Sequence, residues 1–403
     1  MPWSRPTLLL AVVCATAPVG AQQSSGVAPL PKRPGAATAA ADTGYYRVHW
    51  VKSMDQSGFA QPVETARFLL PVDWTYQSKV QWGPPSHCID NFVKVTGRAT
   101  GSDGVSGFEV FPTYGWQWTD DAQSRAQTAQ MYANVAAAGR PCEMIPIVGA
   151  VDYIKQAVLP RYRPGARIIT TEPLPKFAKS VEEQLHASYD GLIQQHLFSY
   201  VKADAGRVRI AYEANGHPTE EWIMAAITVA AKPAYVLNQA QRGQNLQSYV
   251  VTATRVFGFR TPAGKLDSEE GLFETILTSI RPNPGWASAK QQVLQSIASN
   301  QRMGDEQRNA IMLKAQQDVH AIQNASIAHQ SAVQSQEFDD FAHVQRGLEY
   351  YVDPSTHEQL ELSAGYEHSW VNPAGEYILN SNPLFDPRKA IGGNWTELEP
   401  QHH

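Results

Sequence analysis

Aromatic side chains carry the clearest binding signal in this sequence of 403 residues. In the run Tyr114-Gly115-Trp116-Gln117-Trp118 the rings alternate with other residues, so a β-strand would place all three rings on one face. Such a face can stack on sugar rings or on an apolar peptide. Large rings also commonly fill a protein core, and this alternative stays open here. The residues predicted to bind a ligand are Trp74, Trp82, Tyr114, Trp116, Trp118, Tyr366, Trp370 and Tyr377.

Motifs for catalysis and nucleotide binding are missing from the sequence. The stretch Gly104-Val105-Ser106-Gly107 comes nearest to the Gly-x-Ser-x-Gly turn of serine hydrolases, but its spacing is wrong. No phosphate-binding glycine loop and no His-Glu-x-x-His pair occurs. The carboxylate pairs are adjacent residues, which point about 100° apart on a helix and are poorly placed to share a proton. We therefore predict no catalytic residue and no cofactor.

The histidines do not form a metal motif. His320, His329 and His343 fall on one predicted helix but point in different directions around it. His186 and Asp190 share a helix face at a spacing of four residues, and His196 lies to one side of it. Solvent-exposed helix residues are the simpler interpretation of this trio. We predict no metal site.

Two cysteines, Cys88 and Cys142, remain once a predicted signal peptide is removed. An even pair in an oxidising compartment is most simply a disulfide, and we predict this bond. Because His87 and Asp90 flank Cys88, a reactive thiol or a metal site is the alternative. The segment lacks the paired ligand spacing of a zinc motif.

The first 21 residues have the pattern of a signal peptide. Arg5 precedes a short apolar run, and small residues ending at Ala21 suit a cleavage site. A secreted or periplasmic protein is therefore predicted. A lipoprotein with Cys14 acylated is the alternative, although Val12-Val13 before it do not fit that pattern.

The charge of the chain limits its partners. The net charge of −5 argues against nucleic acid and against attachment to an anionic membrane. The apolar run of the signal peptide is about half of what a bilayer span needs, and no later stretch approaches that length. No membrane span is predicted.

Five segments follow from composition and periodicity. A flexible linker over 22–43 precedes an α/β domain over 44–284, a Gln-rich helical arm or hairpin over 285–346, and a small antiparallel β-meander over 347–403. The arm is a natural dimerisation element, so a homodimer through it is a further expectation.

Strands and helices alternate within the α/β domain. The turn Asn215-Gly216 predicts a hairpin between the strands at 207–212 and 221–229. Asp267 and Glu270 predict a capping box at the start of a helix over 268–281. The other predicted strands cover 46–51, 65–70, 92–95, 108–111, 166–170 and 248–257, and the other predicted helices cover 120–139, 151–158 and 175–196.

Two resemblances extend this scheme. The apolar strand ending in Phe68-Leu69-Leu70-Pro71-Val72-Asp73-Trp74, with the later order of elements to 283, resembles the Mog1/PsbP-like fold. The C-terminal Gly365-Tyr366, Trp370-Val371-Asn372 and Gly375-Glu376-Tyr377 resemble a module of uncharacterised secreted bacterial proteins. The first resemblance implies an α+β fold, an antiparallel sheet flanked by helices, and a domain that binds and organises partners. Neither resemblance implies catalytic residues.

Binding is therefore the expected function. We expect a non-catalytic binding or assembly protein of the bacterial cell envelope, with a protein partner and with a glycan or small ligand at the aromatic face. An extracytoplasmic hydrolase of glycans or peptides, with a site built from distant residues, is the first alternative. An envelope metal-binding protein is the second.

Overall fold

A computed structural model describes most of the chain after residue 44. The described residues are 45–59, 61–83, 91–133, 142–234, 245–299, 348–354, 356, 359–363, 366, 368–382 and 384–401. The predicted signal peptide, the linker, Cys88 and most of the helical arm lie outside this set. Within it the fold is mixed α/β with antiparallel sheets, as the sequence predicts. No helix in the described ranges is both long and apolar enough to cross a membrane.

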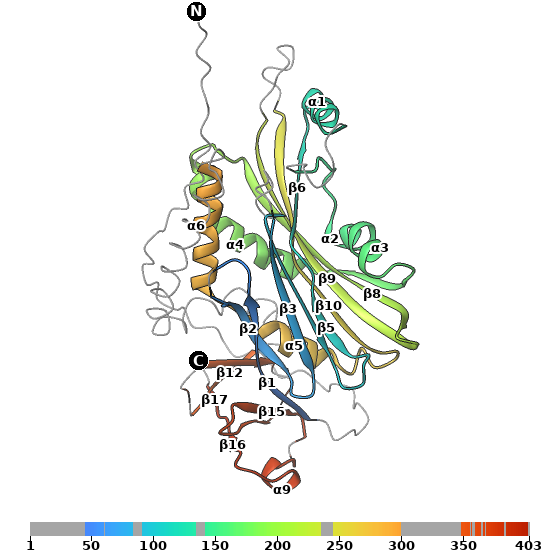
Figure 1. The fold of residues 1–403 in the computed structure, drawn as a ribbon, viewed down its shortest axis with the longest axis vertical. Coiled ribbons are helices and arrows are strands. Elements are labelled where there is room, and N and C mark those ends of the chain that lie inside the picture. Colours follow the sequence, from blue (N-terminus) through green and yellow to red (C-terminus); the bar gives the residue numbers. More distant parts are fainter. Residues whose placement is uncertain are drawn as a thin grey trace, which may run out of the picture.

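An eight-stranded antiparallel sheet forms the centre of the molecule (Figure 1). Its order is β3-β4-β5-β10-β9-β8-β7, and β6 also pairs with β10. The strands are β3 (Thr75–Trp82), β4 (Val93–Thr100), β5 (Gly107–Val110), β6 (Tyr114–Thr119), β7 (Arg167–Pro173), β8 (Tyr200–Ala214), β9 (His217–Pro233) and β10 (Gln247–Pro262).

The predicted hairpin between β8 and β9 is confirmed. Asn215 and Gly216 both have positive φ, 52° and 80°, which a two-residue turn between twisted strands requires. Ala214 lies opposite His217, and the pairing continues to Tyr200 opposite Ala231. The local turn chemistry thus sets the register of the longest strand pair.

Helices cover both faces of this sheet. On one face α4 (Pro175–Gln194) and α5 (Glu270–Thr278) join the largest hydrophobic cluster. On the other face a continuous helical stretch packs against β8 and β9; it consists of α2 (Ala150–Tyr153), η3 (Ile154–Val158) and α3 (Leu159–Tyr162). The apolar side chains on the two faces of the strands therefore pack into two separate hydrophobic cores, one on each side of the sheet.

Two predicted helix boundaries are wrong. Pro160 does not end the helix predicted over 151–158; the helical stretch continues to Tyr162, and the π-helical segment η3 directly before the proline relaxes the hydrogen-bonding pattern at that point. The predicted capping box at Asp267 and Glu270 does not form, because Asp267 pairs with Arg209 and Glu270 pairs with Arg207. Ion pairs with Arg207 and Arg209 of β8 thus take the place of the hydrogen bonds that a capping box would form.

A six-stranded sheet joins the first described strand to the last segment of the chain. Its order is β11-β2-β1-β15-β14-β16, and Tyr45 at the start of β1 lies opposite Asn380. A three-stranded sheet, β13-β12-β17, holds the other C-terminal strands. These strands are β1 (Tyr45–Asp55), β2 (Val63–Pro71), β11 (Arg281–Pro282), β12 (Leu348–Val352), β13 (Gln359–Ser363), β14 (His368–Val371), β15 (Glu376–Asn380), β16 (Thr396–Glu397) and β17 (Pro400–Gln401).

The C-terminal elements gather at one end of the molecule, and α1 (Ala122–Ala133) lies at the opposite end (Figure 1). The short helix α9 (Pro387–Ala390) belongs to the C-terminal group. Tyr351, Leu362 and Tyr377 from this group are buried in the same cluster as α5. The first part of the predicted arm is helix α6 (Pro284–Ser299), which packs against β2 through a cluster that contains Trp286.

Candidate functional site

The predicted aromatic face on β6 packs largely into the core. Tyr114, Trp116 and Trp118 lie opposite Ala253, Val251 and Tyr249 of β10, at alternate positions as the sequence predicts; Trp116 is only 2% exposed and stacks on Tyr153 of α2. The Tyr114 hydroxyl donates to the Glu143 carboxylate, and burial followed by this bond raises the pKa of Tyr114. Trp118 is partly exposed, with the Arg125 guanidinium over its ring.

The three C-terminal aromatic residues of the prediction are also buried. Tyr366, Trp370 and Tyr377 are 6%, 4% and 3% exposed. The Tyr377 hydroxyl donates to buried Asp353 at 2.7 Å, and Tyr366 packs edge-on against Tyr46. These rings hold the C-terminal strands to the rest of the molecule.

Trp74 and Trp82 have structural contacts as well. The Trp74 ring stacks on Phe259 with centroids 6.2 Å apart. The Trp82 indole donates its N–H to the Asp55 carboxylate at 2.8 Å. The structure therefore distributes the eight predicted ligand-binding residues over separate clusters and does not bring them to one face.

Metal and thiol chemistry has little support among the described residues. His186 and Asp190 do share a face of α4, with their side chains 2.7 Å apart. No group of three or more metal-ligating residues meets in the described part of the chain. Cys142 is buried, whereas Cys88 lies outside the described residues, so the disulfide between them stays a prediction.

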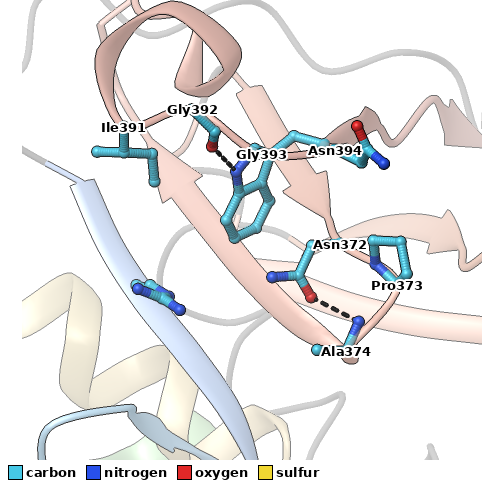
Figure 2. A pocket seen from close by; sticks show the side chains of 9 residues that line it. Asn372, Pro373, Ala374, Ile391, Gly392, Gly393 and Asn394 are labelled. Atoms are coloured by element: carbon cyan, nitrogen blue, oxygen red, sulfur yellow. Dashed lines mark hydrogen bonds between the residues drawn. The ribbon is translucent and has the colours of Figure 1, made fainter.

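A surface pocket of about 410 Å³ lies where β1 meets the C-terminal segment (Figure 2). Figure 2 shows its two walls: the turn Asn372–Ala374 on one side and the loop Ile391–Asn394 on the other. Arg47 of β1 and Trp395 complete the lining. The pocket thus depends on the pairing of the first described strand with β15.

The turn wall is ordered by its own asparagine. The Asn372 side-chain oxygen accepts N–H bonds from Ala374 and Glu376, each at 3.0 Å. Gly375 has φ of 76°, a left-handed conformation that favours glycine. The sequence Asn-Pro-Ala-Gly therefore forms a rigid turn that holds Pro373 and Ala374 at the rim.

Two glycines keep the opposite wall bare. Helix α9 ends before Gly392 and Gly393, whose φ angles of 70° and 94° favour residues without a Cβ. A Cβ added at Gly392 would meet nothing within 4 Å. The Trp395 indole N–H donates to the Gly392 carbonyl at 2.9 Å and fixes the loop. Both backbone and apolar surface are consequently presented to a ligand.

An ion pair between Arg47, which lines the pocket, and Glu376 beside it sets the local charge. The Arg47 guanidinium donates to one Glu376 oxygen at 2.6 and 3.1 Å, and the Asn372 amide donates to the same oxygen at 2.7 Å. Burial acts to raise the pKa of Glu376, but the bonds from Arg47 and Asn372 outweigh it and hold that pKa below its usual range. The pair is close to neutral as a unit. The pocket is therefore suited to a ligand surface with both polar and apolar groups.

Acidification should weaken this pair only at low pH. The Glu376 contribution to stability is present above the unfolded pKa of about 4.3 and is lost as the pH falls through the depressed folded pKa. The free energies of unfolding of the wild type and of Glu376→Gln should therefore converge on acidification. A difference between them that stays constant from about pH 7 to about pH 2 would contradict the ion pair.

The pocket residues were not identified from the sequence. Asn372 and Gly375 enter the prediction only through the C-terminal resemblance, and Trp395 does not enter it. The left-handed Gly392-Gly393 pair before a tryptophan was the one local signal. Arg47 could not be connected to them, because its partner Glu376 is 329 positions away.

In comparisons with known proteins, no family model and no curated protein matches this chain.

Proposed function

We propose that the protein is a non-catalytic binding or assembly protein that holds a protein partner at the pocket between β1 and the C-terminal segment. The observation that carries this proposal is the pocket itself, whose walls are fixed by hydrogen bonds while its rim stays exposed. Ile391 on the rim is 42% exposed, and Leu384 on the same segment is 90% exposed. Exposed apolar residues beside fixed polar groups are typical of a protein-binding surface.

The chemistry of the lining supports a partner rather than a reaction. Arg47 and Glu376 satisfy each other, and the remaining contributions come from amides, glycine backbone and the apolar side chains of Pro373, Ala374 and Ile391. A loop or chain end of a partner has the same mixture of backbone and small apolar groups. The ordered walls lower the entropic cost of binding it.

The compartment and the finer fold are part of the same proposal. The signal-peptide pattern over residues 1–21 supports export to the periplasm or beyond. The antiparallel sheet between helices, with β10 leading into α5, supports the Mog1/PsbP-like resemblance. A partner in the cell envelope fits both.

The test fills the pocket in the otherwise intact chain. Ala374→Trp places a large ring on the exposed rim, and Ala263→Trp makes the same change on an exposed turn that does not line the pocket. Residues 22–403 of each variant are used to capture partners from their own cell envelope. A truncated chain that ends at Pro284, the last residue of the predicted α/β domain, is not a suitable comparison. It lacks β15, the strand that pairs with β1.

We expect one partner to be retained by the wild type and by Ala263→Trp. Its amount should fall by at least about tenfold with Ala374→Trp, as expected when about 1.4 kcal/mol of binding energy is lost. Equal retention by the two variants would contradict the proposed binding surface, and retention of no partner by the wild type would contradict the function.

A further inference from the structure

Strand β7 forms an open end of the eight-stranded sheet. Among the described strands it pairs with β8 alone, and five of its seven residues are exposed. Ile168 on this strand is 39% exposed. A strand that pairs on one side only presents backbone N–H and C=O groups on the other, and these groups can pair with another strand.

The other end of the same sheet is not open in this way. Strand β3 lies against β1, where the Ser78 hydroxyl accepts the Met54 N–H at 3.1 Å and the Ser57 hydroxyl donates to the Val80 carbonyl at 3.1 Å. Strand β6 also pairs within this sheet with β10 alone, but a segment lies along its outer side, where the Gln117 N–H donates to the Glu143 carbonyl at 2.9 Å and the Ile145 N–H donates to the Gln117 carbonyl at 3.0 Å. Among the described strands of this sheet, β7 is therefore the edge at which a further strand can be added.

A bulge gives β7 an unusual distribution of charge. Arg167 lies opposite Ala211 and Glu172 lies opposite Arg207, so five steps along β7 match four steps along β8. The extra residue falls between Ile168 and Thr170. Side chains four apart on β8 share one face of the sheet, and Arg167 and Glu172 therefore lie on one face too.

The two charged residues have different surroundings. Arg167 is exposed and has no ion pair with a described residue. The Glu172 side chain is 44% exposed and accepts a hydrogen bond from the Arg207 Nε at 2.8 Å. Thr170 lies opposite Arg209, which is two residues from Ala211 and two residues from Arg207, so Thr170 lies midway between the two charged residues in the register of the sheet. The strand thus carries a cation at one end and an anion at the other, about a central threonine.

We propose that β7 pairs antiparallel with β7 of a second copy of this chain, about a two-fold axis at Thr170. This arrangement places Arg167 of each copy opposite Glu172 of the other, and Thr170 opposite Thr170. The exposed Ile168 then packs near Thr171 of the second copy. The result is a continuous sheet through both copies, with two ion pairs across the junction. This surface is distinct from the pocket and from the predicted helical arm.

Reversing the charge of Arg167 or of Glu172 tests the pairing, and mixing the two variants provides the control. Arg167→Glu creates two Glu–Glu pairs in the dimer, and Glu172→Lys creates two pairs of like positive charge. A mixture of the two variants restores both attractive pairs in the mixed dimer. Lys79→Glu, on exposed β3, makes the same charge change as Arg167→Glu away from β7. Sedimentation of the mature chain, residues 22–403, is measured over a concentration series.

We expect the wild type and Lys79→Glu to dimerise equally. Each β7 variant alone should dimerise about tenfold more weakly, and their mixture should recover the wild-type dimer. A monomeric wild type at every concentration would overturn the proposal and leave β7 open to a strand of another protein. A dimer that neither variant weakens, or a mixture that does not recover, would also overturn it.

Discussion

Replacing Glu221 with alanine should lower the free energy of unfolding by about 3–5 kcal/mol. The Glu221 side chain is 0% exposed and accepts hydrogen bonds from Arg163 Nε at 2.6 Å and from the Tyr212 hydroxyl at 2.8 Å. Burial alone would lower the pKa of Arg163, but Glu221 and then Glu109 raise it above the usual value. Removing Glu221 leaves a largely buried cation with one carboxylate in place of two.

Glycines make room for this cluster. A Cβ on Gly258 would lie 2.4 Å from the Glu221 carboxylate, and a Cβ on Gly107 would lie 2.5 Å from the Arg260 guanidinium. Strands β10 and β5 therefore carry glycine at the positions where the side chains of Glu221 and Arg260 need the space. Arg163 follows α3, so the cluster also fastens the helices of that face to β9.

Chemical denaturation of Glu221→Ala, Arg163→Ala and the double variant measures the effect. The double variant should lose much less than the sum of the single losses, because each single change leaves a buried charge behind. Glu213→Ala, at an exposed position on β8, should change stability by no more than about 0.5 kcal/mol. A loss below about 1 kcal/mol for Glu221→Ala would show that the cluster contributes little.

Replacing Asp55 with alanine should lower the free energy of unfolding by about 3 kcal/mol or more. Asp55 is 0% exposed, and its carboxylate accepts N–H bonds from Ser57 and Gly58 and from the indoles of Trp82 and Trp286, at 2.8–3.0 Å. Alanine would leave four donors without this partner, and the bonds from Gly58 and Trp286 are buried. The same carboxylate joins β1, β3 and α6, which are far apart in the sequence.

Thermal and chemical unfolding of Asp55→Ala can be compared with Asp73→Ala, whose carboxylate is exposed and accepts a single hydroxyl. The Asp73 variant should stay within about 0.5 kcal/mol of the wild type. Quenching or shifting of tryptophan fluorescence should accompany the Asp55 change, because two indoles lose their acceptor. Equal stability of the two variants would contradict the assigned role of Asp55.

Local signals predicted much of the fold. The Asn215-Gly216 turn, the alternation along β6 and the apolar stripe of α4 depend on neighbouring residues, and each led to the right element. The predicted cap at Asp267 and Glu270 was wrong because partners from β8 decide what those side chains contact. Long-range pairing is not visible in a local pattern.

The candidate site was hidden for the same reason. Tryptophans in the core and tryptophans in a binding face look alike in a sequence, so Trp116 and Trp370 were grouped with Trp118. The pocket requires Arg47 to meet Asn372 and Gly392, and only the antiparallel pairing of β1 with β15 brings them together. A glycine pair and an Asn-Pro-Ala-Gly sequence are typical of loops, but neither shows that the two loops converge in the fold.

Photo-crosslinking from the pocket rim tests the proposed function most directly. A photoreactive phenylalanine derivative replaces Ile391, or Ala263 as a control outside the pocket lining, in residues 22–403, and the protein is exposed to the cell envelope in which we propose that it acts. We predict one discrete adduct from position 391 that is absent from position 263 and is lost when Ala374→Trp is added. No discrete adduct at position 391, or the same adducts from both positions, would contradict the proposal that the pocket holds a partner.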